Sequence, residues 1–379
     1  MLNSKTEALG IIFPNSYDAM VPELASERLM ASIPFASRYR MCDFILSSMV
    51  HSGIDNISII VRKNYHSLLD HLGAGREWDL VRKNGGLNIV PPFAQKQVKV
   101  FEGRIEALES LRGYLLKQPQ KYVIMTENIA INFDFNELLD AHIKSGADVT
   151  MMYRKQEIPK AFIRQSRDRM DLYYALGMNG DRVSKIYINP TEEGEMNFSM
   201  NIYVVEREFL INMIDDAYVH GHTYFVRDLL DKQIDRLDIR GFCYDGYVVN
   251  IHDTQSYFEE NMRLLQEENL NALFSPNQIY TKIRDDNPTR YINGSKAKNV
   301  MVADGCVIEG EVENSVLFRG VHVGKGAKVK NCVLMQDTVV EDNASVEYVI
   351  TDKNVRVTEG KSLTGNESYQ VYVSKGQVV

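Results

Sequence analysis

The last part of the chain repeats every seventeen residues, and this period restricts the fold more than any other feature. Three columns of β-branched residues keep the spacing: Val312, Val329 and Val346; Val316, Val333 and Ile350; Val323, Val340 and Val357. Seventeen residues is close to one coil of a left-handed parallel β-helix, and the small residue Ala327 recurs as Ala344. Such a period indicates a solenoid, because β-sandwich strands would not hold three columns in one register.

The preceding part alternates between apolar runs and helical patterns. Predicted strands cover residues 8–13, 56–61, 87–90, 122–125, 148–153, 173–178, 183–188, 200–205 and 244–251. Predicted helices cover residues 64–72, 104–116, 135–145, 206–216, 225–236 and, as one long element, 254–273. This rhythm predicts a Rossmann-like α/β domain with a mixed, mostly parallel sheet. We therefore expect an α/β domain at residues 1–274, a linker at 275–293 and the β-helix at 294–379.

Composition excludes several classes of protein. The 379 residues carry a net charge of −8, so no basic excess is present to bind nucleic acid. No run approaches the roughly 18 apolar residues of a membrane helix, and the first residues lack the apolar core of a signal peptide. The four cysteines are scattered without metal-type spacing. We therefore expect a cytoplasmic protein with reduced thiols that binds neither nucleic acid nor membrane.

A second informative stretch runs from residue 35 to 54, where a polar turn leads into a predicted helix. Phe44, Ile45 and Met49 recur near helical spacing, Asp43 suits the first turn, and Gly53 suits the C-terminal cap. By pattern alone, this is an ordinary helix–strand unit of an α/β domain.

The same stretch resembles the signature F-G-G-x-Y-R-x-x-D-F-x-L-S-N-x-x-N-S-G-I of glucose-1-phosphate adenylyltransferases. These enzymes make ADP-glucose from ATP and glucose 1-phosphate for glycogen or starch synthesis. The matching residues are Phe35, Tyr39, Arg40, Asp43, Phe44, Leu46, Ser47, Ser52, Gly53 and Ile54. The family architecture, a nucleotidyltransferase domain followed by a β-helix, agrees with the periodicities. The resemblance therefore implies a sugar-phosphate nucleotidyltransferase fold.

Other segments extend the resemblance over nearly the whole chain in matching order. Residues 101–107, Phe-Glu-Gly-Arg-Ile-Glu-Ala, resemble the family's Y-R-G-T-A-D-A. Residues 199–204, Ser-Met-Asn-Ile-Tyr-Val, resemble its S-M-G-I-Y-V. Residues 257–261, Tyr-Phe-Glu-Glu-Asn, resemble its Y-W-x-A-N. The scaffold positions of the family are thus retained.

The positions that carry the family's chemistry are replaced. The transfer needs two carboxylates to hold Mg²⁺ against the phosphates, and the resemblance places Asn128 and Asn250 at them. The neighbouring carboxylates are Glu127, one residue from Asn128, and Asp253, three residues from Asn250. A register slip by an odd number of residues turns a strand side chain to the opposite face. We therefore predict that the Mg²⁺ site is lost and that the chain uses no cofactor.

The phosphate-binding segments have changed as well. The family loop G-G-x-G-x-R-L is matched by residues 15–21, which contain no glycine and no arginine. Backbone cannot approach a triphosphate as closely past Cβ atoms, and Asp18 adds repulsion. The remnant of this nucleotide loop is Asn15, Ser16, Asp18 and Met20. The R-A-K-P motif becomes residues 28–31 without its lysine, and Asn189 replaces the lysine of the E-K-P motif that grips the sugar phosphate.

These joint losses in an intact frame resemble the non-catalytic subunit type of the bacterial enzyme. We therefore expect a catalytically degenerate subunit that modulates a catalytic homologue, as a heterotetramer, with at most weak binding of nucleotide or sugar phosphate. Two alternatives remain: an active sugar-phosphate nucleotidyltransferase with atypical metal ligands, and a β-helix acyltransferase. The acyltransferase would need a catalytic histidine in the solenoid, where only His322 lies.

Three arginines flank the stretch at residues 35–54. Arg28, Arg38 and Arg40 either gather an anionic effector or are ordinary surface arginines.

Overall fold

The computed structural model describes residues 7–15, 18–91, 103–165, 173–192 and 194–379. The chain forms two compact units. The sheet unit comprises Met1–Met20, Ile45–Ile129 and Phe133–Gly246; the β-helix unit comprises Val21–Phe44, Ala130–Asn132 and Tyr247–Val379. Residues 21–44 and 247–274, which the sequence assigns to the α/β domain, are therefore grouped with the β-helix. None of the described helices is long and apolar enough to cross a membrane.

A nine-stranded mixed sheet forms the sheet unit, in the order β5-β4-β1-β6-β10-β7-β11-β9-β8. Strand β1 is parallel to both β4 and β6, and β10 is antiparallel to β6 and β7. The strands are β1 (Ala8–Phe13), β4 (Asn56–Ile60), β5 (Gly86–Val90), β6 (Tyr122–Glu127), β7 (Val149–Glu157), β8 (Tyr174–Asn179), β9 (Arg182–Ile188), β10 (Glu195–Glu206) and β11 (Ile239–Cys243). The predicted fold class is confirmed.

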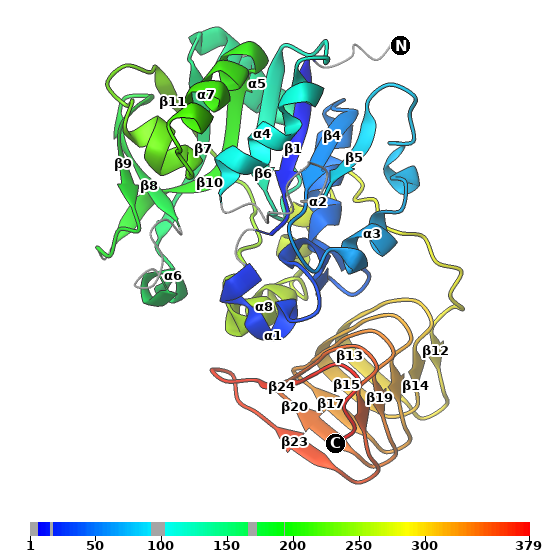
Figure 1. Ribbon diagram of the computed structural model, residues 1–379. Helices are drawn as coiled ribbons and strands as arrows, with labels where there is room; N and C mark the ends of the chain where they lie inside the picture. Colours follow the sequence, from blue (N-terminus) through cyan, green and yellow to red (C-terminus); the bar gives the residue numbers. More distant parts are fainter. Residues whose placement is uncertain (1–6, 16–17, 92–102, 166–172, 193) are drawn as a thin grey trace. The chain divides into compact units, whose positions relative to one another are not determined.

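The helices of this unit include α3 (His66–Leu72), α4 (Arg104–Leu115), α5 (Phe135–Ser145), α6 (Lys160–Gln165), α7 (Arg207–Val219) and a π-helix at Phe225–Asp231. Helices α4, α5 and α7 lie against the sheet, whereas α6 stands apart from these three helices (Figure 1). Their ends follow local chemistry: Asp134 accepts a hydrogen bond from the Asn136 N–H at the start of α5, and Gly146 ends it with a φ of 65°. Helices α4 and α7 bury their apolar faces in the main core.

Two predicted elements are wrong. Residues 244–251 are not a strand, because the chain bends at Gly246 and only Val249 makes an isolated bridge, to Ala130. The predicted helix at 254–273 is two helices, α8 (Thr254–Arg263) and α9 (Glu267–Phe274). The chain is extended at Gln266, with a φ of −90° and a ψ of 128°, while Leu264 turns into the core.

The seventeen-residue period is confirmed by the strand register. Val312 pairs with Val329 and Val329 with Val346, and the other two columns pair in the same way. One sheet comprises β12 (Arg290–Tyr291), β14 (Val307–Ile308), β16 (His322–Val323), β19 (Val339–Val340) and β22 (Arg356–Val357). The other comprises β13 (Lys296–Val302), β15 (Glu311–Leu317), β17 (Lys328–Lys330), β18 (Val333–Leu334), β20 (Ser345–Glu347), β21 (Val349–Thr351), β23 (Ser362–Thr364) and β24 (Val371–Val373). Figure 1 shows these coils stacked from yellow to red.

The rest of the β-helix unit packs against this solenoid. It contains α1 (Pro22–Ala25), the hairpin β2 (Pro34–Phe35) and β3 (Tyr39–Arg40), the start of α2 (Met41–His51), and helices α8 and α9. Leu24, Phe44 and Tyr257 share one buried core with Val316 and Val333 of the solenoid. The solenoid is therefore part of a larger hydrophobic core.

Candidate functional site

The strand order of the sheet unit reverses between β1 and β6. From β1 the chain proceeds to β4 and β5 on one side, and then crosses to β6 on the other side of β1. Ligands of open α/β sheets bind outside the strand carboxyl ends where the strand order reverses in this way. Strands β1 and β6 end in register at Phe13 and Glu127. We call this place the switch-point crevice.

The loop after β1 is held by its own side chains. Asn15 donates a hydrogen bond from its Nδ2 to Asp18 (2.7 Å), and its Oδ1 accepts one from the backbone N–H of Arg62 (2.9 Å). The Asn15 amide thus ties the loop to the segment after β4. Ser16 lies outside the described residues. The described loop residues present no cation to a phosphate.

Met20 occupies the position that the resemblance assigns to an arginine. It is buried in an apolar cluster with Ile158, Phe162, Tyr173 and Phe198. A position expected at a nucleotide loop is therefore part of a hydrophobic core.

Asn128 and Asn250 lie in different compact units. Asn128 follows β6 and is 6% exposed; neither its Nδ2 nor its Oδ1 has a hydrogen-bond partner among the described residues. Asn250 is half-buried, and its backbone N–H faces the Glu260 carboxylate at 3.4 Å. Both offer neutral amides, whereas Mg²⁺ is usually held by carboxylates. These two residues do not supply the charge that the family's metal needs.

The two neighbouring carboxylates are engaged elsewhere. Glu127 forms an ion pair with Arg104 and accepts a hydrogen bond from Asn201 Nδ2 at 3.0 Å. Asp253 caps α8, since its Oδ1 accepts from the Ser256 N–H at 2.7 Å and the Ser256 hydroxyl lies 2.9 Å from the Asp253 N–H. Both carboxylates thus have structural partners.

Asn189 also has a structural role. Its Oδ1 accepts a hydrogen bond from the Tyr173 N–H (3.1 Å), and its own N–H donates to the Tyr173 carbonyl (3.0 Å). Its φ is 49°, a left-handed conformation that asparagine tolerates better than most residues. Asn189 therefore extends the β8–β9 pairing at the end opposite the turn, at a position where the resemblance expects a lysine.

The three flanking arginines have different surroundings within the β-helix unit. Arg28 is buried and forms a bidentate pair with Asp352, at 2.7 and 2.8 Å. Tyr372 also donates to this carboxylate, at 2.9 Å. Arg28 is therefore neutralised by a partner inside the unit.

Arg38 and Arg40 are more exposed than Arg28. Arg38 lies 3.9 Å from Asp304 in an exposed pair. Burial, together with the positive charges of Arg40 and Arg28, lowers the pKa of Lys353 to about 7. Arg40 and Arg28 thus surround Lys353, whereas Arg38 pairs elsewhere.

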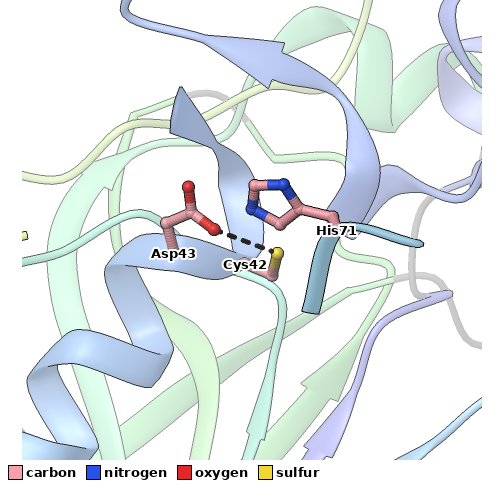
Figure 2. Close-up of side chains that lie close together, drawn as sticks. All are labelled: Cys42, Asp43 and His71. Carbon is pink, nitrogen blue, oxygen red and sulfur yellow. Dashed lines mark hydrogen bonds between the residues drawn. The ribbon is translucent and has the colours of Figure 1, made fainter. Parts of the chain in front are cut away.

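The start of α2 holds a buried thiol. Figure 2 shows Cys42, whose Sγ donates a hydrogen bond to Asp43 Oδ1 at 3.5 Å. Burial and the Asp43 carboxylate raise the Cys42 pKa well above its usual value. The thiol is therefore protonated and a poor nucleophile. Cys42, Cys243, Cys306 and Cys332 are all free.

His322, which the acyltransferase alternative would require, is partly exposed and lies 3.2 Å from Glu309 Oε1. The structure gives it the surroundings of a surface side chain.

Sequence reasoning missed Arg104 and Asn201. Both stand in segments that resemble the family scaffold, at positions where the family motifs have threonine and glycine. The signal was the change from small to large residues at these positions.

Comparisons with known proteins agree with the two-part architecture. A family model described as nucleotidyl transferase matches residues 23–267, and one described as GlmU-like, C-terminal hexapeptide matches residues 283–372. The hexapeptide match agrees with a left-handed parallel β-helix.

Three curated relatives cover most of this chain. The glycogen biosynthesis protein GlgD of Bacillus subtilis (strain 168) is 33% identical over 98% of this chain and 97% of its own length. GlgD of Geobacillus stearothermophilus is 35% identical over 85% of this chain and 82% of its own length. The glucose-1-phosphate adenylyltransferase of Geobacillus stearothermophilus is 30% identical over 86% of this chain and 84% of its own length. The chain therefore belongs to the nucleotidyl transferase family, within its GlgD-type group of glycogen biosynthesis proteins.

Proposed function

We propose that this chain is a catalytically degenerate subunit of glucose-1-phosphate adenylyltransferase in glycogen biosynthesis. It modulates a homologous catalytic subunit that converts ATP and glucose 1-phosphate to ADP-glucose and diphosphate. The observation that carries the proposal is Asn128, a buried neutral amide at the predicted metal position, whose polar atoms have no hydrogen-bond partner in the described part of the chain.

The loss of chemistry follows from electrostatics. A metal held by carboxylates neutralises the charge that develops at the attacked phosphorus, and removing it costs several kcal/mol of transition-state stabilisation. Each 1.36 kcal/mol is a factor of ten in rate. Glu127 and Asp253 are poor replacements, because an ion pair and a helix cap already engage them. Met20 and Asn189 further stand where the resemblance expects an arginine and a lysine.

A non-catalytic homologue influences synthesis by shifting its partner between conformations. Coupling of this kind is typically about 1–3 kcal/mol, or roughly 5–150-fold in affinity. We propose a heterotetramer with the catalytic subunit, in which the positive charges of Arg38, Arg40 and Lys353 attract an anionic effector, while Asp352 neutralises Arg28.

The experiment is a titration of the catalytic adenylyltransferase from the same genome with this chain. We expect a change in maximal rate, apparent substrate affinity or effector response. A variant with Arg38→Gln and Arg40→Gln tests the effector role, and Arg236→Gln, an exposed arginine of the sheet unit, serves as the control. If this chain changes none of the three quantities, the modulatory role is wrong. Synthesis by this chain alone would favour an active transferase with atypical ligands.

The interface with the partner needs a test that keeps the unit folded. Removal of residues 294–379 would expose the core that Leu24 and Tyr257 share with the solenoid. Substitution at the first coil is cleaner, because Ile283 and Tyr291 are exposed apolar side chains there. We expect Ile283→Asp with Tyr291→Asp to weaken co-purification, whereas Tyr369→Asp, also exposed, serves as the control. Unchanged co-purification would place the contact elsewhere.

A further inference from the structure

The switch-point crevice contains side chains of the chain itself. Arg104, the first residue of α4, forms an ion pair with Glu127 at the end of β6. Its guanidinium carbon lies 5.1 Å from the ring centroid of Phe13, the last residue of β1, and 5.8 Å from that of Tyr203. Strands β1 and β6 are the two that define the crevice. One arginine thus spans both.

The carboxylate of Glu127 is satisfied on both oxygens. Oε1 faces Arg104, and Oε2 accepts a hydrogen bond from Asn201 Nδ2 at 3.0 Å. The Tyr203 hydroxyl in turn donates to Asn201 Oδ1 at 2.7 Å. Glu127 is 5% exposed and Asn201 is 2% exposed. Buried charges persist when they are paired and hydrogen-bonded in this way.

Backbone packing fixes where these side chains begin. A Cβ at Gly103 would lie 2.2 Å from the Thr223 carbonyl oxygen, so the chain before Arg104 lies directly against residue 223. Asn201 has a φ of 55°, and the β10–β7 register shifts between Ser199 and Ile202. Bulges of this kind re-aim side chains. The network therefore rests on the fold and needs no bound ligand to order it.

We propose that Arg104, Glu127 and Asn201 are an internal occupant of the switch-point crevice, which excludes a nucleotide from it. The guanidinium lies against the two rings and the edge of the sheet, where a ligand of this topology would bind. The pair has no net charge, because Glu127 balances the guanidinium, so it offers phosphate no attraction. The motifs that this chain resembles have threonine at the position of Arg104 and glycine at those of Glu127 and Asn201. Each replacement therefore adds a larger side chain to the switch-point crevice.

The test measures ligand binding by the isolated chain with calorimetry. This inference rests on the proposed loss of catalysis. The binding experiment contains no catalytic subunit, so its result does not depend on whether this chain modulates one. The probes are ATP with Mg²⁺ and the neutral nucleoside adenosine. The test variant combines Arg104→Ala with Glu127→Ala, removing both charges. The control combines Arg112→Ala with Asp215→Ala, which removes a half-exposed pair between α4 and α7.

We expect no binding of either probe by the wild-type chain or the control at millimolar concentration. The test variant should bind adenosine with a Kd at least about tenfold below the lower limit that the wild-type titration sets on its own Kd, a difference of about 1.4 kcal/mol. Binding of ATP or adenosine by the wild type as tightly as by the variant would overturn the proposal. A folded variant that gains no binding would also overturn it, because the pair would then not be what excludes the ligand.

A thermal double-mutant cycle tests the pair itself. Arg104→Ala alone leaves Glu127 buried without its cation, so we expect a lower Tm for this variant than for the double variant. Additive shifts for Arg104→Ala and Glu127→Ala would show that the two side chains do not interact, and would contradict the proposal.

Discussion

The coils of the β-helix and the carboxyl edge of the sheet follow different rules. In the coils, each column repeats one type of residue, as Val312, Val329 and Val346 do, because every layer meets the same packing problem. At the sheet edge, Met20, Glu127 and Asn189 depart from the family motifs, and each has a structural partner. A frame can thus be maintained by packing while positions released from chemistry acquire structural roles.

The largest expected loss of stability comes from a buried pair of the β-helix unit. Asp352→Ala should lower the free energy of unfolding by about 3–5 kcal/mol, because it leaves Arg28 buried without its carboxylate. Urea denaturation measures the change. Asp304→Ala, which breaks the exposed pair with Arg38, should cost less than about 1 kcal/mol. Equal costs would mean that Arg28 is not committed to Asp352 and is open to an effector.

At the sheet edge, Met20→Ala should cost about 2–5 kcal/mol in unfolding free energy, the usual range for a buried methionine. Ala19→Gly, at the exposed neighbouring position, controls for backbone effects in the same 3₁₀ turn. If Met20→Ala left the unfolding free energy nearly unchanged, the Met20 side chain would not be part of the hydrophobic core.

Another effect should appear in the pH dependence of stability. The pKa of Lys353 is about 7 in the folded chain because of burial and the charges of Arg40 and Arg28, against about 10.4 when unfolded. Between these values the unfolded state binds the additional proton, so this lysine makes stability rise with pH from about 7 towards 10. Lys353→Met should flatten the rise in unfolding free energy over that window. An identical slope in the variant would contradict the assignment.

The smallest effect is expected from restoring the two carboxylates. Asn128→Asp with Asn250→Asp rebuilds the ligand types for a metal, but leaves the loop without glycine and Asn189 in place of a lysine. We therefore expect ADP-glucose formation by the isolated double variant to stay far below that of a catalytic relative. Full activity would show that the loops are still competent, and that only two residues separate the chain from an enzyme.

The solenoid columns and the first strand were predicted well, because their packing produces a regular pattern of apolar residues within a short stretch of sequence. The three solenoid columns pair as expected, and Ala8–Phe13 forms a strand at the expected bounds. The break between α8 and α9 escaped prediction, because the burial of Leu264 that accompanies it is tertiary.

The site was predicted only by what it lacks. Each replacement of a carboxylate, by Asn128 or by Asn250, can be recognised within a single motif. The network of Arg104, Glu127 and Asn201 joins three segments that are distant in the sequence, so no single motif reveals it. Local conformation was also hidden: Ala36 and Ser37 have φ values of 50° and 63° where the family signature has glycines. A change of residue therefore did not reveal whether the backbone had changed.

The central claim, that the sheet edge no longer performs nucleotidyl transfer, is tested most directly by the turnover of the isolated chain. ADP-glucose formation from ATP, glucose 1-phosphate and Mg²⁺ should be measured beside the isolated catalytic homologue at equal concentration. We predict a rate lower by about a thousandfold or more, as expected when metal-held charge stabilisation worth several kcal/mol is absent. A comparable rate from this chain alone would contradict the account.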